Sequence, residues 1–186
     1  HDWAIEPDWA LQTHGLGNGL SVIINACSRP GEAVIIFSPV YHSFARIIKV
    51  NDRRVHASPM RIKDGRFQMD LDALAASLTG DEKIMFLCSP HNPGGRVWSA
   101  EELRNVALFC ETHDIIVVSD EVHHDLIMPG HSHTILAKVA PEISRRLITL
   151  VATSKTFNIA GIETGSMLIP DPALRQRVAR VRHAMN

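Results

Sequence analysis

The sequence lacks the residue patterns that mark several classes of protein. Its three cysteines, Cys27, Cys88 and Cys110, are far apart and stand in apolar surroundings, which favours reduced buried thiols over disulfides or a metal cluster. The formal net charge is -1 with lysine and arginine scattered, so neither nucleic acid nor an anionic membrane is an expected partner. Apolar runs such as residues 33–37 are too short to cross a bilayer, and no signal-peptide pattern opens the chain.

The composition is that of an ordinary globular domain. Of the 186 residues 45% are hydrophobic and 21% are charged, which is enough apolar material for a sizeable core. No linker, internal repeat or low-complexity tract divides the chain, so we expect one domain over residues 1–186. With no targeting pattern, we expect it in the cytoplasm.

Short apolar runs alternate with amphipathic segments along the chain. Strands are predicted at residues 10–13, 33–37, 54–57, 83–88, 115–119, 147–151 and 166–169. After a loop at residues 14–18, helices are predicted to about residue 29 and at 41–50, 70–78, 99–113 and 134–140, with a hairpin turn at 63–66. Ser99 and Glu102 form a capping box for the fourth helix. This alternation predicts an α/β fold with a mostly parallel sheet flanked by helices.

Side chains that could bind a ligand or take part in a reaction follow four of the predicted strands. Tyr41, Asn92 and Lys155 each come after a strand, and Asp120 and His123 come after a fourth. Ligands of open parallel sheets bind at the carboxyl ends of the strands. We therefore expect these five side chains to meet in one crevice.

A fifth element is the turn Gly15-Leu16-Gly17-Asn18 at the entry to the first helix. Free N–H groups and the positive end of the helix dipole would receive an anion there, most simply a phosphate. Neither the spaced glycines of a dinucleotide fingerprint nor a Gly-Lys-Ser/Thr phosphate loop is present, which argues against Rossmann oxidoreductases and NTPases.

The cluster of His123, His124, His131 and His133 near Asp125 could be interpreted as a metal site. However, Pro129-Gly130 interrupts the segment, and the spacing fits no metalloprotease helix motif. We predict no bound metal, and we expect His131 and His133 to lie in a loop or at a helix entry.

Three segments, in this order, resemble the core motifs of fold type I pyridoxal-phosphate enzymes, the aspartate aminotransferase superfamily. They are Ser89-Pro90-His91-Asn92-Pro93-Gly94-Gly95, Ser119-Asp120-Glu121-Val122-His123 and Thr153-Ser154-Lys155. Together with Gly95-Arg96-Val97-Trp98 and Thr156-Phe157-Asn158-Ile159-Ala160-Gly161, they are most similar to the cystathionine β-lyase-like MalY/PatB family. The resemblance implies a three-layer α/β/α cofactor-binding large domain around a seven-stranded mixed sheet.

The resemblance also implies roles for ten residues toward pyridoxal 5'-phosphate. Lys155 would hold the cofactor as a Schiff base and then move protons, and burial among apolar groups would keep its amine neutral. Asp120 would pair with the pyridine nitrogen, and without Lys155 and Asn92 it would be interpreted as a helix cap. The other implied contacts are Asn92 and His123 to the phenolic oxygen, Tyr41 to the ring face, and Thr153, Ser154, Gly15, Leu16 and Gly17 to the phosphate.

The sequence departs from the superfamily in two respects. Many members carry a phosphate-binding arginine eight residues after the lysine, where this chain has Glu163. A carboxylate cannot replace a guanidinium, so Glu163 either points away or the phosphate depends on hydroxyls and the helix terminus. Complete members also have a small domain that supplies an arginine for the substrate carboxylate. We expect that domain to be absent here, and we assign that task to none of Arg175, Arg177, Arg180 and Arg182.

The resemblance predicts a pyridoxal-phosphate-dependent carbon–sulfur β-lyase that cleaves a cysteine conjugate to a thiol, pyruvate and ammonia. A class I/II aminotransferase is the alternative, because it would use the same residues. An inactive fragment or a regulatory, partner-binding module is a third possibility, since the terminal segments of the family are missing. The family builds its active sites across a dimer, so a homodimer acting on an amino acid is expected.

Overall fold

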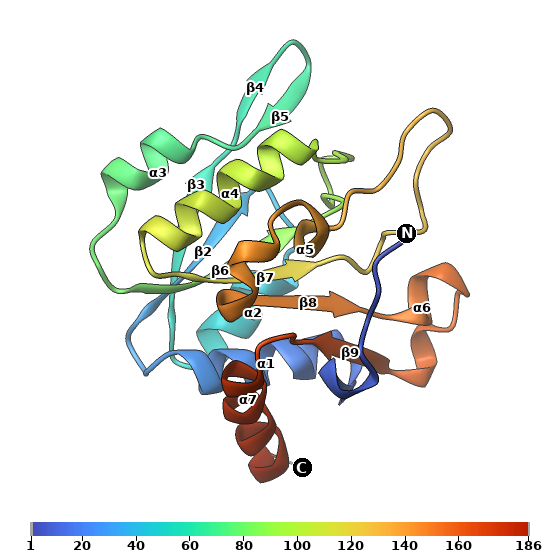
Figure 1. The fold of residues 1–186 in the computed structure, drawn as a ribbon. Helices are drawn as coiled ribbons and strands as arrows, with labels where there is room; N and C mark the ends of the chain where they lie inside the picture. The colour runs from blue at the N-terminus through green and yellow to red at the C-terminus, as the bar shows by residue number, and fades with distance from the viewer. Residues whose placement is uncertain (1, 186) are drawn as a thin grey trace.

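In the computed structural model, which describes residues 2–185, seven strands form one central sheet. Figure 1 shows how the helices pack around this sheet. The spatial order of the strands is β1-β9-β8-β7-β6-β2-β3, and β9 alone runs antiparallel to its neighbours. The strands are β1 (Ala10–His14), β2 (Ala33–Ser38), β3 (Arg54–Pro59), β6 (Glu82–Cys88), β7 (Ile116–Asp120), β8 (Leu147–Val151) and β9 (Thr164–Leu168), and β4 (Arg61–Lys63) pairs with β5 (Arg66–Gln68) as a separate hairpin. The predicted mostly parallel mixed sheet and the hairpin are confirmed.

Helices cover both faces of this sheet. Helices α1, α2 and α7 supply the core on one face, and α3, α4 and α5 supply it on the other. Their bounds are α1 (Gly15–Cys27), α2 (Ser43–Val50), α3 (Leu71–Ser77), α4 (Ala100–Thr112), α5 (Leu136–Val139), α6 (Thr153–Thr156) and α7 (Pro172–Met185), with short 3-10 turns η1 (Pro7–Trp9), η2 (Pro141–Arg146) and η3 (Ala160–Ile162). Within residues 2–185 no helix has the length and apolarity to span a membrane.

The three layers follow from the two-residue period of buried strands. On β2, Val34 and Ile36 pack toward α1 and α2, whereas Ile35 and Phe37 pack toward the α4 face. All four are almost completely buried, which explains why this strand appears in the sequence as an uninterrupted apolar run. A sheet buried on both faces leaves the ends of its strands as the place for a site.

The structure corrects several predicted boundaries. Residues 14–18 were expected to form a loop, but α1 begins at Gly15, directly after β1. The positive φ of Gly15, 71°, lets the chain turn from strand to helix without a linker. The helix expected at 134–140 is the short α5, and Pro141 opens a 3-10 turn after it. The Ser99 capping box of α4 is present as predicted.

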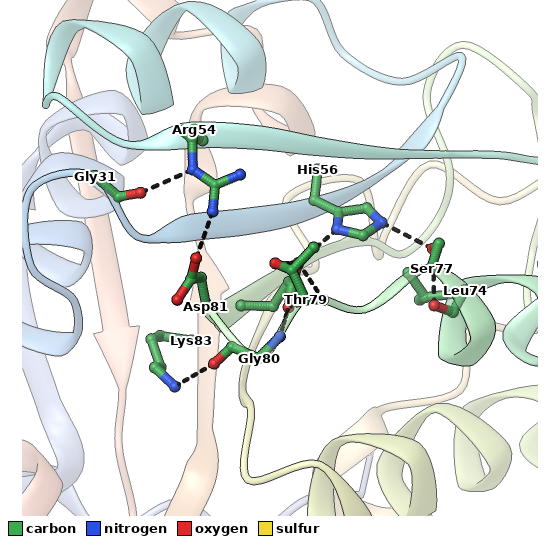
Figure 2. A network of polar contacts seen from close by, with 10 residues as sticks. Gly31, Arg54, His56, Leu74, Ser77, Thr79, Gly80, Asp81 and Lys83 are labelled. Carbon is green, nitrogen blue, oxygen red and sulfur yellow. Dashed lines mark hydrogen bonds and ion pairs between the residues drawn. The ribbon is translucent and has the colours of Figure 1, made fainter.

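The buried carboxylate of Glu82 connects β3 to the segment after α3. Figure 2 shows His56 of β3 close to Ser77 and Thr79 of that region. His56 Nδ1 lies 2.8 Å from Glu82 Oε1, and His56 Nε2 lies 3.0 Å from Ser77 Oγ. The Thr79 hydroxyl and the N–H groups of Thr79 and Gly80 donate to the same carboxylate. Burial alone would raise the pKa of Glu82, but the hydrogen bonds from His56, Thr79 and the backbone outweigh it and lower the pKa to about 2.

Candidate active site

A pocket of about 380 Å³ lies where β6, β7 and β8 end and α1 and α2 begin. It brings together nine of the ten predicted cofactor-binding residues: Gly15, Leu16, Gly17, Tyr41, Asn92, Asp120, His123, Ser154 and Lys155. Thr153 does not line it and instead lines a neighbouring pocket of about 570 Å³. The expected convergence of strand ends is therefore found in the fold, while the roles of the individual residues stay predictions.

Asp120 is the last residue of β7 and is buried, with 7% of its surface exposed. Its Oδ1 accepts the backbone N–H of Val122 at 3.2 Å. Burial raises the pKa of Asp120 to about 6, and the charge of Glu121 adds to the rise, while the Val122 N–H and Lys155 oppose it. An acid held in this way is destabilised as an anion and would gain from a nearby cation.

The thiol of Cys88, at the end of β6, holds the start of the next loop. Its Sγ accepts the backbone N–H of Asn92 at 3.3 Å and lies 3.4 Å from the Pro90 carbonyl oxygen, to which it donates. Burial, together with the charge of Asp120, raises the pKa of Cys88 to about 12, so the thiol stays protonated. This contact fixes the backbone of Asn92 at the wall of the pocket.

His123 and Tyr41 close two further sides of the pocket. Burial lowers the pKa of His123, and the charge of Lys155 lowers it further, so the imidazole is kept neutral at pH 7. Tyr41 is 40% exposed, and its ring meets the Phe44 ring edge-on with 5.8 Å between centroids. The Tyr41 ring also lies edge-on to the His42 ring, with 5.0 Å between centroids.

Lys155 lies on α6, a single helical turn that follows β8. The Phe157 N–H donates to the Thr153 carbonyl at 3.0 Å, and the Thr156 hydroxyl donates to Asp125 Oδ2 at 2.8 Å. The prediction that Lys155 is buried among apolar groups is wrong for this chain, because Lys155 is an exposed residue of the pocket wall. A four-residue helix has no second turn to cover it.

Sequence reasoning missed Ser43 and Arg46, which line the pocket wall. Asn18, which was named in the predicted anion-binding turn, and Glu163, which was noted in place of the usual arginine, line it as well. Glu163 has a left-handed backbone, with φ of 49°, at the end of η3. Arg46 lies five residues after Tyr41, a spacing that places two helical side chains on different faces, so the local sequence gave no signal for it.

The histidine cluster has a structural explanation. The side chain of His133 is 1% exposed, and its Nε2 lies 2.6 Å from Oε2 of the buried Glu121. Glu121 Oε1 accepts the Ser119 hydroxyl at 2.9 Å and the Leu136 N–H at 3.2 Å. In the described part of the chain no three potential ligands gather closely enough to hold a metal ion.

The family model for class I and II aminotransferases matches residues 3–186. The chain belongs to this family. Cystathionine β-lyase PatB of Bacillus subtilis is 36% identical over 178 residues, which are 95% of this chain and 46% of that protein. Human kynurenine–oxoglutarate transaminase 1 is 31% identical over 89% of this chain and 41% of that protein.

Solved structures agree on the fold. Cystalysin from Treponema denticola, whose crystal structure contains a pyridoxal 5'-phosphate cofactor, superposes with a TM-score of 0.95 at 37% identity. The match covers 99% of this chain and 47% of cystalysin. The three-layer α/β fold is thereby confirmed, and the chain spans about half the length of the proteins that it matches.

Proposed function

We propose that this chain is the cofactor-binding part of a pyridoxal-phosphate-dependent carbon–sulfur β-lyase acting on a cysteine S-conjugate. The observation that carries the proposal is the single pocket that collects Asn92, Asp120, His123 and Lys155 from three strand ends. The PatB relative is named as a cystathionine β-lyase, and the cystalysin structure contains the cofactor. Each of these similarities supports the same family of reactions.

The donor set of the pocket fits pyridoxal phosphate group by group. Lys155 offers an amine for the aldehyde, and the destabilised carboxylate of Asp120 suits a protonated pyridine nitrogen. Asn92 and His123 can contact the phenolic oxygen, and the ring of Tyr41 can stack on the pyridine. Asn18 Oδ1 is a buried acceptor without a partner among residues 2–185, so the pocket has room for one hydrogen-bond donor of a ligand.

In the proposed β-elimination, the side chains of this site have different roles. When bound, the cofactor would supply the electron sink for the α-carbon of the amino acid. The Lys155 amine would take the proton from that carbon, and Asp120 would keep its negative charge beside the pyridine nitrogen. Loss of the thiolate from the β-carbon then leaves an enamine, which hydrolyses to pyruvate and ammonia.

An aminotransferase is the second candidate, favoured by the 31% identity to the human transaminase. It would use the same residues and would return the proton to the cofactor instead of expelling sulfur. The two candidates are separated by giving the intact protein cystathionine with no keto acid. Catalytic formation of pyruvate supports the lyase, whereas turnover that requires an added keto acid supports the transaminase.

Cofactor binding is tested first, on the intact protein that contains this chain. We expect a protonated Schiff-base absorbance band that survives gel filtration and is lost in Lys155→Ala. Lys63→Ala, which changes an exposed lysine of the β4–β5 hairpin, is the matched control and should keep the band. A wild-type protein without the band would support the inactive-fragment or partner-binding alternative. The same gel filtration tests the homodimer that we expect.

A further inference from the structure

If the pocket binds pyridoxal phosphate as proposed, few positive charges face the negative charge of the cofactor phosphate. A phosphate monoester carries between one and two negative charges at neutral pH. Glu163 lines the pocket and adds another negative charge. Lys155 is committed to the aldehyde in the proposed function. A further cation near the first turn of α1 would offset this negative charge.

Arg46 is the arginine that lines this pocket among the described residues. It lies on α2, which packs against the first turn of α1: Ile47 Cδ1 would be 3.8 Å from a Cβ atom placed on Gly17. The wall of the pocket thus places α2 and the turn Gly15-Leu16-Gly17 beside each other.

The guanidinium of Arg46 is exposed and makes no hydrogen bond or ion pair with any of residues 2–185. Some other arginines of the chain are anchored. Arg53 bonds Ser28 and Asn25, and Arg96 forms a bidentate pair with Glu102 at 2.7 and 2.8 Å. Among the described residues, the arginines that resemble Arg46 in having no side-chain hydrogen bond or ion pair are Arg29, Arg66, Arg104, Arg145 and Arg180, and none of these lines the pocket. Arg46 can therefore bind an anion with its planar guanidinium without breaking a hydrogen bond or ion pair within the protein.

We propose that Arg46 binds the cofactor phosphate and determines the preference of this site for the phosphorylated cofactor. It would serve in place of the arginine that many superfamily members carry at the position of Glu163. Arg46 approaches from α2, whereas Glu163 approaches from the turn before β9, so the two residues come from different elements.

The test compares two ligands that differ only in the phosphate, pyridoxal 5'-phosphate and pyridoxal. Dissociation constants are measured from the absorbance band on the intact protein, without amino-acid substrate. Arg46→Gln should weaken binding of pyridoxal phosphate about fivefold, as expected for loss of one charge-assisted contact at a solvent-exposed site, and should change pyridoxal binding less than about twofold. Arg46→Lys should recover part of the difference, because it keeps the charge without the fork.

The matched control is Lys49→Gln, which removes a positive charge one turn further along α2 from a residue outside the pocket wall. It should leave both dissociation constants unchanged. Raising the ionic strength should shrink the effect of Arg46→Gln on pyridoxal phosphate, since exposed charges are screened. Circular dichroism should show the same fold for every variant.

The outcomes separate the inference from the proposed function. Equal weakening of both ligands by Arg46→Gln, or weakening of neither, would overturn the role of Arg46 while the proposed function stands. An equal loss with Lys49→Gln would show a general field effect and would also overturn it. If the wild-type protein forms no band with pyridoxal phosphate, the inference fails together with the proposed function.

Discussion

Replacing Asp120 with asparagine should stabilise the cofactor-free protein. Asp120 is buried at the end of β7, and only one hydrogen bond to its carboxylate, from the Val122 N–H at 3.2 Å, is seen among the described residues. An asparagine is nearly the same size and can accept that hydrogen bond through its own Oδ1. The substitution therefore removes the charge and leaves the geometry.

The magnitude follows from the pKa of Asp120, which burial raises from 3.8 to about 6. Because each pKa unit corresponds to about 1.4 kcal/mol, the buried anion destabilises the folded state by up to about 3 kcal/mol at neutral pH. Below pH 3.8 the group is protonated in both the folded and the unfolded protein, and the penalty is absent. Stability is lost as the pH rises through about 6.

The assay is urea denaturation of the intact protein freed of cofactor, at pH 8 and at pH 4. Asp120→Asn should raise the free energy of unfolding by about 2 to 3 kcal/mol at pH 8 and by less than about 0.5 kcal/mol at pH 4. The same variant should bind pyridoxal phosphate more weakly, since in the proposed function the carboxylate pairs with the protonated pyridine nitrogen.

A matched control is Glu82→Gln, the same chemical change at a carboxylate whose pKa is lowered from 4.5 to about 2. Here the anion is favoured, and its stabilisation of up to about 3 kcal/mol is present above pH 4.5 and lost as the pH falls through about 2. Glu82→Gln should therefore destabilise the protein at pH 8. If Asp120→Asn also lowered stability at pH 8, or if its effect were equal at both pH values, the reasoning would be refuted.

Three further substitutions probe the supports of the site. His133→Ala should destabilise the protein by about 3 kcal/mol in urea denaturation, because it removes one partner of a buried pair and leaves Glu121 behind, and an effect below about 1 kcal/mol would contradict this. Ser99→Ala should cost about 1 kcal/mol by the same measurement through loss of the α4 cap; a neutral result would show that the cap is dispensable. Gly165→Ala should weaken cofactor binding measured by absorbance, since its new Cβ would lie 2.6 Å from Leu16 Cδ2 at the pocket wall, and unchanged affinity would mean that Leu16 relaxes freely.

Much of the fold could be predicted from the sequence because the strands are buried on both faces. Val34, Ile35, Ile36 and Phe37 are all apolar, so the run marks the strand whichever face each residue meets. The α4 cap at Ser99 was equally readable, since it depends on residues three apart. The ends of helices that depend on a single residue were harder to predict, as the start of α1 at Gly15 shows.

The candidate site was only partly predictable for a related reason. Nine of the ten expected residues share one pocket, because polar residues that follow parallel strands meet at one edge of the sheet. Thr153 immediately precedes Ser154 yet lines a different pocket, because successive residues on a short helical turn point in different directions. The exposure of Lys155 depends on what packs over α6, and its local sequence carries no sign of that.

The sequence by itself determined the alternation of strands and helices, the order of the three motifs and the residue types that suit a pyridoxal-phosphate site. Those features are local, and each is encoded within a few positions. Only the tertiary structure decided that Arg46 shares the pocket with the first turn of α1, that His133 is paired with Glu121 and that the carboxylate of Asp120 is buried. These depend on which distant segments pack together, and packing sets both the distance between charges and the water around them.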